Sequence, residues 1–324
     1  MDSNKDRYID FCKKEENIPI FSQYWWLDSV CGKDNWDVAL VEMQNNIIAS
    51  MPYYYTKKGN FFSIIMPPLT QVMGPYIKSP QEQKSYKKLS FEKKVMNELI
   101  AQFPKFDAFH QRFNFTTTNW LPFYWNGYKQ STRYTYVIEN LGNINGVIND
   151  FSSAKKKNIK KSEKLLDIKY DLTAEEFYAN HKMALSKQGM EITYSFNVFK
   201  KIYVNGYNND SAKTIYAIDK DNNIHGALFI IWDRNTAYDL ISTIDPDFRN
   251  SGSASLLVLE AIKLASIKTK KFDFEGSMIE NVENSFRQFG TVQQQYFEIK
   301  KENPSFNKTK NLLKEIYHDL IKSL

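Results

Sequence analysis

The stretch from residue 238 to residue 290 constrains the fold of this 324-residue chain most strongly. Residues 238–244 are rich in β-forming side chains and predict a strand. Between residues 251 and 267, apolar side chains recur every three or four positions, which predicts a helix. Residues 271–276 alternate between polar and apolar side chains, as a second strand would. The order strand, loop, helix, strand is typical of an α/β protein.

The loop between this strand and helix carries residues suited to bind an anion. Gly252 permits a backbone conformation closed to other residues, and Ser251 or Ser253 can cap the helix. Amides at a helix N-terminus donate hydrogen bonds to phosphate, and Arg249 adds a full positive charge. We therefore predict a phosphate-binding site in this loop. Its residues are Arg249, Asn250, Ser251, Gly252, Ser253 and Ala254.

The composition is that of a folded protein in the cytoplasm, and the length suits two domains. Hydrophobic residues make up 42% of the chain and charged residues 25%. No apolar run approaches the roughly 20 residues of a membrane helix, and the N-terminus lacks the apolar core of a signal peptide. The two cysteines and four histidines show no metal-ligand spacing, so we expect no metal. The net charge of +6 favours anionic partners.

The two halves of the chain show the same order of features. Residues 45–53 parallel residues 222–230, and the aromatic-glycine segment 123–128 parallels residues 286–290. A strand-like segment follows each aromatic-glycine element. We predict a duplicated unit, with an N-terminal domain over residues 1–142 and a C-terminal domain over 147–324. Each is expected to be an α/β (α+β) unit in which helices flank a mixed, mostly antiparallel sheet.

Only the second copy keeps the phosphate loop. At the corresponding place the first copy has Gly74 and Pro75, with Pro80 following. Proline lacks the backbone N–H that a phosphate would need. The first copy is therefore predicted to be degenerate.

The pattern Arg-x-x-Gly-x-Ala, after a strand and before a helix, resembles the pyrophosphate loop of the GNAT acyltransferases. The resemblance implies that Arg249, Gly252 and Ala254 hold the diphosphate of an acyl-CoA. It also implies that the preceding strand pairs with the pantetheine arm. The strand residues concerned are Ile241, Ser242, Thr243 and Ile244.

Two such units with a degenerate first copy resemble the FemABX family. The marks of this resemblance are the lysine-rich segment 152–164, Phe177 with Tyr178, residues 273–276, and residues 286–290. The family transfers acyl or aminoacyl groups to amines. The resemblance implies transfer from acetyl-CoA or another acyl-CoA to a small-molecule acceptor, an amino-sugar or peptidoglycan-type precursor of the cell envelope.

Two alternatives stay open. An aminoacyl-tRNA donor, as in the Fem enzymes proper, is disfavoured because the chain lacks the extended coiled-coil insertion of the long-armed members. A catalytically silent module that binds a nucleotide or glycan is the other alternative. Peripheral contact with a membrane also stays open.

Asp273 and Glu275 are the candidate catalytic carboxylates. Two residues apart on a strand, both would point to one face, while Phe272 and Phe274 pack under the helix on the other. A carboxylate there can take the proton from an attacking amine. The alternatives are an ion pair with Lys271 or Arg287, or capping of the next helix by Glu275 and Ser277.

The general acid for the departing thiolate has no assignment from sequence. The resemblance implies a tyrosine just before the aromatic-glycine element, where this chain has Phe286 and the first copy has Tyr124. Tyr238 and Tyr296 are the alternatives. Because the expected tyrosine is missing, the alternative of a catalytically silent binding module stays open. The six lysines between residues 155 and 164 are interpreted as a solvated face, with binding of an anion as the alternative.

Overall fold

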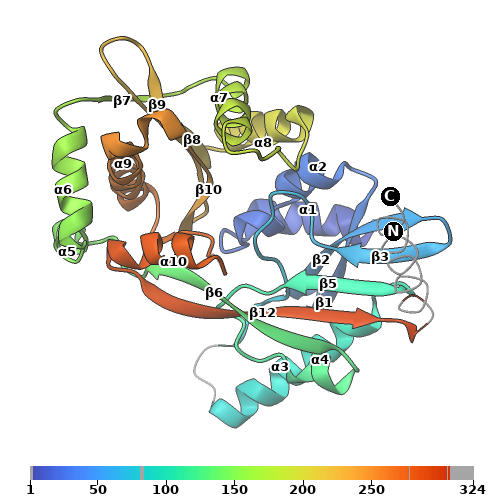
Figure 1. Cartoon of the computed structure of the whole chain (residues 1–324). Helices are drawn as coiled ribbons and strands as arrows, with labels where there is room; N and C mark the ends of the chain where they lie inside the picture. Colours follow the sequence, from blue (N-terminus) through green and yellow to red (C-terminus); the bar gives the residue numbers. More distant parts are fainter. Residues whose placement is uncertain (1–2, 81–83, 277, 305, 307–324) are drawn as a thin grey trace. The chain divides into compact units, whose positions relative to one another are not determined.

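The computed structural model describes residues 3–80, 84–276, 278–304 and 306 (Figure 1). Contacts divide the chain into two compact units. Unit 1 comprises the described residues of segments 1–14, 31–133 and 296–324, and unit 2 comprises 15–30 and 134–295. The predicted domains, residues 1–142 and 147–324, refer to the two repeats of the sequence and remain a prediction.

Unit 1 is a mixed sheet with helices on both faces. In order, its strands are β1 (Trp36–Met43), β2 (Asn46–Lys58), β3 (Phe61–Ile65), β5 (Ala108–Arg112) and the unit-1 part of β12 (Val292–Glu302), with β4 (Tyr76–Ile77) on β2. All these neighbours are antiparallel except β3 and β5. Helices α3 (Ser85–Ala101) and α4 (Leu121–Trp125) supply core residues such as Leu99 and Phe123. Helix α1 (Asn4–Lys14) packs on β1.

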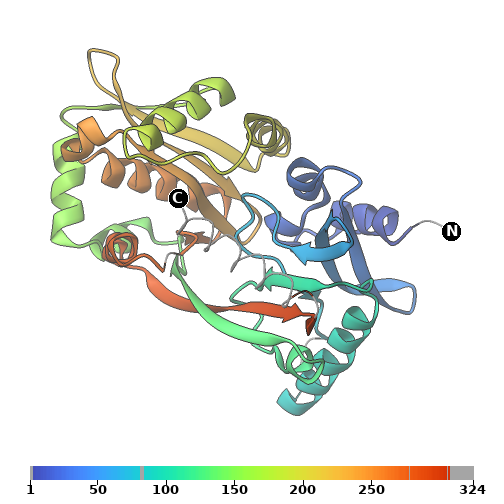
Figure 2. The ribbon, with the colours of Figure 1, turned by 45° about the vertical axis from the view of Figure 1, so that its right-hand side comes forward.

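Unit 2 is a second mixed sheet with helices on both faces. In order, its strands are the unit-2 part of β6 (Lys129–Ile138), β11 (Lys271–Asp273), β10 (Thr236–Ile244), β9 (Ile224–Trp232), β8 (Ala212–Ile218) and β7 (Asp167–Tyr170). Helix α9 (Ser253–Lys268) covers one face, while α7 (Ala174–Ser186) and α8 (Phe196–Asn208) lie on the other (Figure 2). The remaining elements are η1 (Ile20–Ser22), α2 (Tyr24–Cys31), α5 (Ile144–Asn149), α6 (Ser153–Ser162), η2 (Pro246–Ser251), α10 (Glu280–Phe286) and η3 (Arg287–Phe289).

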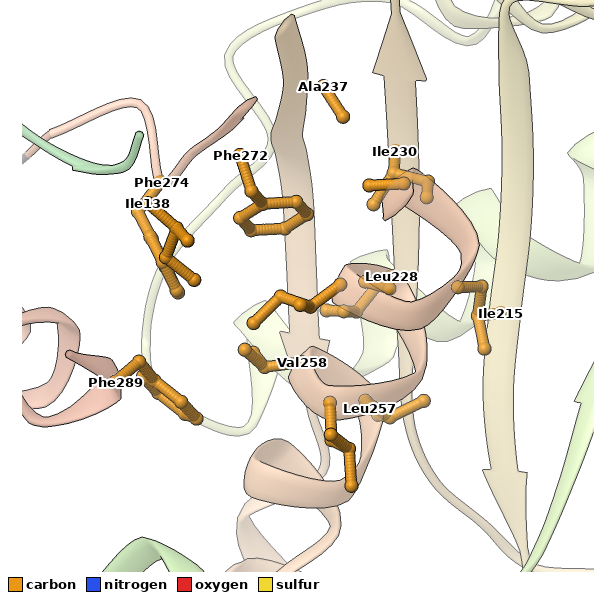
Figure 3. Packing of buried hydrophobic residues seen from close by; sticks show 14 of the residues in the cluster. Ile138, Ile215, Leu228, Ile230, Ala237, Leu257, Val258, Phe272, Phe274 and Phe289 are labelled. Atoms are coloured by element: carbon orange, nitrogen blue, oxygen red, sulfur yellow. The ribbon is translucent and has the colours of Figure 1, made fainter. Parts of the chain in front are cut away.

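The core of unit 2 explains the apolar spacing of residues 251–267. Leu257 and Val258 of α9 point toward the apolar side chains of β9 and β11, including Leu228 and Phe272 (Figure 3). Leu257 is fully buried, whereas Ile267, near the end of the same helix, is 81% exposed. One face of α9 therefore attaches the helix to the sheet.

The structure confirms the predicted fold class and shows the duplicated order. In each repeat, two antiparallel strands are followed by a long helix and then by a third strand. The third strand is parallel to the second. These parallel pairs are β3 with β5 and β10 with β11. A short helix follows, and each ends near a glycine with left-handed backbone, Gly127 at φ 80° and Gly290 at φ 69°. The last strand of each repeat, β6 or β12, comes next.

These last strands are exchanged between the repeats. In unit 2, β6 of the first repeat pairs with β11, joining Ile138 to Phe272. In unit 1, β12 of the second repeat pairs with β5, joining Glu298 to Arg112. Each unit is thus completed by a strand from the other half of the sequence.

Leu257→Ala should lower the free energy of unfolding by about 2–5 kcal/mol, because the truncation leaves a cavity under α9. Ile267→Ala on the same helix is the matched control and should change it by less than about 0.5 kcal/mol. Urea unfolding followed by circular dichroism measures both. Equal effects of the two substitutions would contradict the packing of α9 described above.

Candidate functional site

The predicted phosphate loop is a tight turn between β10 and α9. It consists of the 3₁₀ turn η2 followed by Gly252, which has left-handed backbone at φ 84°. The conformation predicted for Gly252 is therefore confirmed. The predicted serine cap is wrong, because Gly252 itself is the N-cap and no side chain caps the helix. The Ser251 hydroxyl instead accepts a hydrogen bond from the Ser253 amide at 3.3 Å.

One side of this loop is covered by α6. Lys161 Nζ donates to the carbonyl of Asn250 at 2.6 Å, and the Ser162 hydroxyl donates to the carbonyl of Ser251 at 2.8 Å. A Cβ added at Gly252 would lie 2.8 Å from the Asn158 carbonyl oxygen. The glycine is therefore needed for close packing against α6 as well as for its backbone angle.

The other side of the loop is open. Arg249, Asn250 and Ala254 are exposed, and the Ala254 amide has no hydrogen-bond partner among the described residues. Ser253 is buried, and its hydroxyl has no partner in the same part of the chain. An exposed amide at the start of a helix, with an exposed guanidinium on the same loop, is the arrangement that binds phosphate groups.

An ion pair fixes the start of the loop. Lys187, at the end of α7, donates to both carboxylate oxygens of buried Asp245 at 2.8 Å and also contacts Asp247. These hydrogen bonds raise the pKa of Lys187, so the lysine stays charged. Asp245 in turn accepts from the Asp247 amide at 3.0 Å and caps η2. The path of the loop is thus set before the helix begins.

Strand β10 has an open edge next to this loop. It pairs with β11 only from Thr236 to Tyr238, in parallel, and then continues to Ile244. Its antiparallel pairing with β9 is interrupted by a bulge at Leu240. Among the described residues, no strand occupies the β11 side of β10 beyond Tyr238. Of the predicted strand residues on this stretch, Ile241 and Thr243 are buried, Ile244 is partly buried and Ser242 is exposed.

Asp273 lies at the end of β11, on the face opposite α9. Ala237 and Phe272 form a register pair on the α9 face, so the next pair, Tyr238 and Asp273, points the other way. Asp273 is 4% exposed and accepts hydrogen bonds from the Thr135 hydroxyl and, at 2.8 Å, from the Glu275 amide. Burial raises the pKa of Asp273 to about 6, against an ordinary value of 3.8, although both hydrogen bonds oppose this rise.

Glu275 does not share a strand face with Asp273, so that prediction was wrong. β11 ends at Asp273, and Glu275 has left-handed backbone at φ 59°. The cause is local, because the Asp273 side chain accepts from the amide two residues on and turns the chain out of the strand. Gly276 follows with φ 62°, and a Cβ there would meet the Tyr134 carbonyl oxygen at 2.2 Å. The predicted packing of Phe272 and Phe274 in the core is confirmed.

Two residues of this region were not predicted from the sequence. Asp239, on β10 at the bulge, is buried, and burial raises its pKa to about 6. Its oxygens accept from the Ser242 hydroxyl at 2.8 Å. Thr135 comes from β6, far away in sequence. The only signal for Asp239 was a carboxylate inside an apolar strand, and nothing in the sequence pointed to Thr135.

The aromatic candidates for a general acid stay unassigned. Tyr238 is fully buried with its ring 4.9 Å from that of Phe21, and burial raises its pKa well above the ordinary value. Tyr296 belongs to unit 1, where its hydroxyl accepts from Gln71 at 3.2 Å. Phe286 packs against Phe274, and Tyr124 is 58% exposed in the first repeat.

The lysine-rich segment is only partly a solvated face. Lys155 packs its ammonium over the ring of Phe289 and donates to the Ser285 hydroxyl at 2.8 Å. Burial lowers the pKa of Lys155 to about 8. Lys156 donates to the Asn149 carbonyl at 2.7 Å. Lys157, Lys160 and Lys164 are exposed, and exposed Lys161 holds the Asn250 carbonyl.

No group of three or more histidine, cysteine or acidic side chains among the described residues could hold a metal ion. No helix in the same part of the chain is long and apolar enough to cross a membrane.

The chain was compared with known proteins. No protein-family model matches its sequence, and no curated protein matches it either. The structure of FemX matches with a TM-score of 0.66 at 11% identity, covering 92% of this chain and 96% of FemX. L-PGS from Bacillus licheniformis matches with a TM-score of 0.56 at 9% identity, covering 96% of each chain. The C-terminal domain of a putative lysylphosphatidylglycerol synthetase from Agrobacterium fabrum matches with a TM-score of 0.52 at 9% identity, covering 93% of this chain and 92% of that one.

The chain therefore has the fold of FemX along nearly its whole length. This confirms the fold that the sequence resemblance implied, and at these identities the similarity concerns the fold alone.

Asp273→Asn should change how stability depends on pH. The folded state holds the Asp273 proton up to about pH 6, whereas the unfolded chain releases it near pH 3.8, so wild-type stability falls as the pH rises between these values. Asparagine keeps the acceptor oxygen but cannot ionise. The stability of the variant relative to wild type should therefore rise by up to about 3 kcal/mol between pH 4 and pH 7.

Urea unfolding at a series of pH values measures this difference. Asp167→Asn, at an exposed position on β7, is the control for a general loss of charge. If the curves of wild type and Asp273→Asn ran parallel across this range, Asp273 would not be buried in the neutral form.

Proposed function

We propose that this chain is an acyltransferase that moves an acyl group, acetyl from acetyl-CoA, to an amino group by direct attack. Its acceptor is an amino-sugar or peptidoglycan-type precursor of the cell envelope, and the reaction takes place in the cytoplasm. The FemX-type fold supports the class of reaction. The geometry of unit 2 supports the choice of donor.

One observation carries the proposal: the open edge of β10 leads directly into the Gly252 turn. An extended pantetheine arm can hydrogen-bond to that edge between Asp239 and Ile244, as an added strand would. The diphosphate at the end of the arm then reaches the exposed Ala254 amide at the start of α9. Arg249 and Lys161 place two cations at this loop.

The chemistry needs a proton acceptor near the thioester. The amine nitrogen attacks the carbonyl carbon, a C–N bond forms, the C–S bond breaks, and the sulfur leaves as a thiolate that takes a proton from water. Asp273 is our candidate to accept the proton of the amine, because a pKa near 6 leaves it ionised at neutral pH yet more basic than an ordinary aspartate. Since it is 4% exposed, the proton would pass through water or through the partly buried Glu275.

An aminoacyl-tRNA donor is the second candidate. The resemblance of the sequence to the Fem enzymes proper, which implies that donor, and the FemX-type fold support it. The exposed lysines of α6 beside the loop could contact the phosphates of an RNA. The acceptor would be the same class of amine, so the donor is the difference to test.

Ala254→Asp is the sharpest test of the donor. A substitution at Gly252 would disturb the packing on Asn158 and confuse ligand binding with folding. Ala254 is exposed in the first turn of α9, where an added carboxylate is favourable for the helix. The same carboxylate would repel a diphosphate at that place.

Acetyl-CoA should raise the midpoint of thermal unfolding of the wild-type protein, and Ala254→Asp should abolish the rise without lowering the midpoint of the ligand-free protein. Ala254→Ser is the matched control and should keep the response. Free acetate and charged tRNA are the comparison ligands. A rise with charged tRNA alone would favour the second candidate, and an equal rise in Ala254→Asp would remove the loop from the donor site.

Asp273→Asn should lower kcat for acyl transfer by about 10²–10⁴-fold while the affinity for acetyl-CoA stays unchanged. Glu275→Gln should have a smaller effect if it only relays the proton. Steady-state kinetics with an amine acceptor and a thiol assay measure both. Normal turnover by Asp273→Asn would exclude it as the base, and binding of acetyl-CoA with no turnover for any amine would favour the silent module.

A further inference from the structure

Unit 1 contains a cluster of cations around one buried carboxylate, which we call the Glu298 cluster. Glu298 on β12 is 5% exposed. It contacts Lys300 Nζ at 2.6 Å, His110 Nε2 at 3.0 Å and the Ser131 hydroxyl at 3.1 Å. Arg112 Nε and Arg133 Nη1 each lie 3.6 Å from its Oε1 atom. Burial alone would raise the pKa of Glu298, but the hydrogen bonds from Lys300 and His110 hold it at about 2.

Strand register places this cluster on one face of the sheet. Glu298 pairs with Arg112 and Lys300 pairs with His110, so these four side chains point the same way. The alternating residues, Phe109 and Ile299, point into the core beneath α3 and α4. The cluster therefore lies on the face of unit 1 opposite those helices.

The cluster has more positive charge than its carboxylate can neutralise. Three permanent cations, Arg112, Arg133 and Lys300, face the single negative charge of Glu298. No other carboxylate among the described residues forms an ion pair with any of them. The Nε atoms of Arg112 and Arg133 are buried without a hydrogen-bond partner in that part of the chain.

The arginine heads are accessible to a ligand. The side chains of Arg112 and Arg133 are 28% and 32% exposed, and that of Lys300 is 49% exposed. At 3.6 Å from Glu298 the two guanidinium groups are beyond hydrogen-bond distance of it, so most of their donors have no partner among the described residues. Paired guanidinium groups with uncommitted donors match the oxygens of a phosphate.

The duplication gives a second, independent reason to regard this place as a site. Phe109 pairs with Ile64 in unit 1 as Phe272 pairs with Ala237 in unit 2, all within the cores. The next residue is His110 in one repeat and Asp273 in the other. Across the sheet, Glu298 contacts His110 as Thr135 contacts Asp273. The Glu298 cluster thus occupies the position in unit 1 that the candidate base occupies in unit 2.

We propose that the Glu298 cluster binds a phosphate-bearing anion with at least two negative charges, such as the diphosphate of a ligand. Arg112 and Arg133 donate hydrogen bonds to the phosphate oxygens, and Lys300 adds a positive charge beside them. Glu298 holds the three cations in position in the absence of the ligand. The two positive charges left uncompensated by Glu298 match a dianion. This site lies in unit 1 and is separate from the acyl-CoA loop, so the inference does not depend on the proposed donor.

A purely structural ion network is the competing explanation. Such a network would place hydrogen bonds between Glu298 and the arginines, because a buried carboxylate gains most from the shortest contacts. Here Lys300, His110 and Ser131 already satisfy Glu298, and both guanidinium groups stay outside hydrogen-bond distance. The arginines are therefore held near the carboxylate but remain available to another anion.

Isothermal titration with inorganic pyrophosphate at low ionic strength tests the proposal. Arg112→Gln and Arg133→Gln should each weaken binding roughly ten- to a hundredfold, because each removes charged donors to the phosphate. Arg112→Lys, which keeps the charge but loses the planar fork, should retain part of the affinity. Arg234→Gln in unit 2, where the arginine pairs with Glu16, is the matched control and should bind as wild type does.

All titrations are repeated in the Ala254→Asp background, where binding of pyrophosphate at the acyl-CoA loop is suppressed. Binding that survives Ala254→Asp and is lost in Arg112→Gln and Arg133→Gln supports the Glu298 cluster as the site. Undiminished binding in both arginine variants, or no pyrophosphate binding at all in the Ala254→Asp background, overturns it. Circular dichroism verifies that each variant is folded. If a glutamine variant is not folded, Arg112→Lys is used in its place.

Two further arms identify the source of the phosphate in nature. A nucleoside diphosphate is titrated in the same way, and sedimentation with phosphatidylglycerol vesicles is measured for wild type and the arginine variants. Arginine-dependent binding of the nucleotide, or of the vesicles, supports a phosphate site and names the kind of molecule that carries the group. If the nucleotide or the vesicles bind equally well to wild type and to both arginine variants, that result counts against the proposal.

Discussion

The exchange of the last strands is the constraint on which the rest of the structure depends. The short strand β11 would have an unpaired edge without β6, and β5 would lack its neighbour without β12. Unpaired edges expose backbone donors and acceptors, which proteins avoid. Neither half of the sequence therefore completes its own sheet, although each encodes a full set of elements.

This exchange also builds the candidate site in unit 2. Thr135 of β6, from the first half of the sequence, donates the hydrogen bond that holds Asp273. Gly276 must be glycine because the Tyr134 carbonyl of the same strand occupies the space of a Cβ. The predicted boundary between residues 142 and 147 concerns the repeats, whereas the surroundings of Asp273 include a strand that lies before that boundary.

Local signals predicted most of the fold and about half of the candidate site. The strand, the Gly252 turn and α9 follow from apolar spacing and one glycine, and the duplicated order follows from matching segments in the two halves. Glu275 could not be placed, because a single hydrogen bond from its amide to Asp273 ends the strand early. The Glu298 cluster gave no signal, since Glu298 lies 188 residues from His110 and 167 residues from Ser131 in the sequence.

The two units place carboxylates with opposite electrostatics at corresponding regions of their sheets. In unit 2, Asp273 is buried among neutral donors, which lifts its pKa to about 6 and makes it a proton acceptor near neutral pH. In unit 1, Glu298 is surrounded by cations, which hold its pKa at about 2 and keep it permanently charged. A carboxylate that never takes a proton cannot act as a base, but it can hold arginines in place. In neighbouring positions of their sheets, unit 2 therefore carries a group suited to proton transfer and unit 1 a group suited to organising charge for binding.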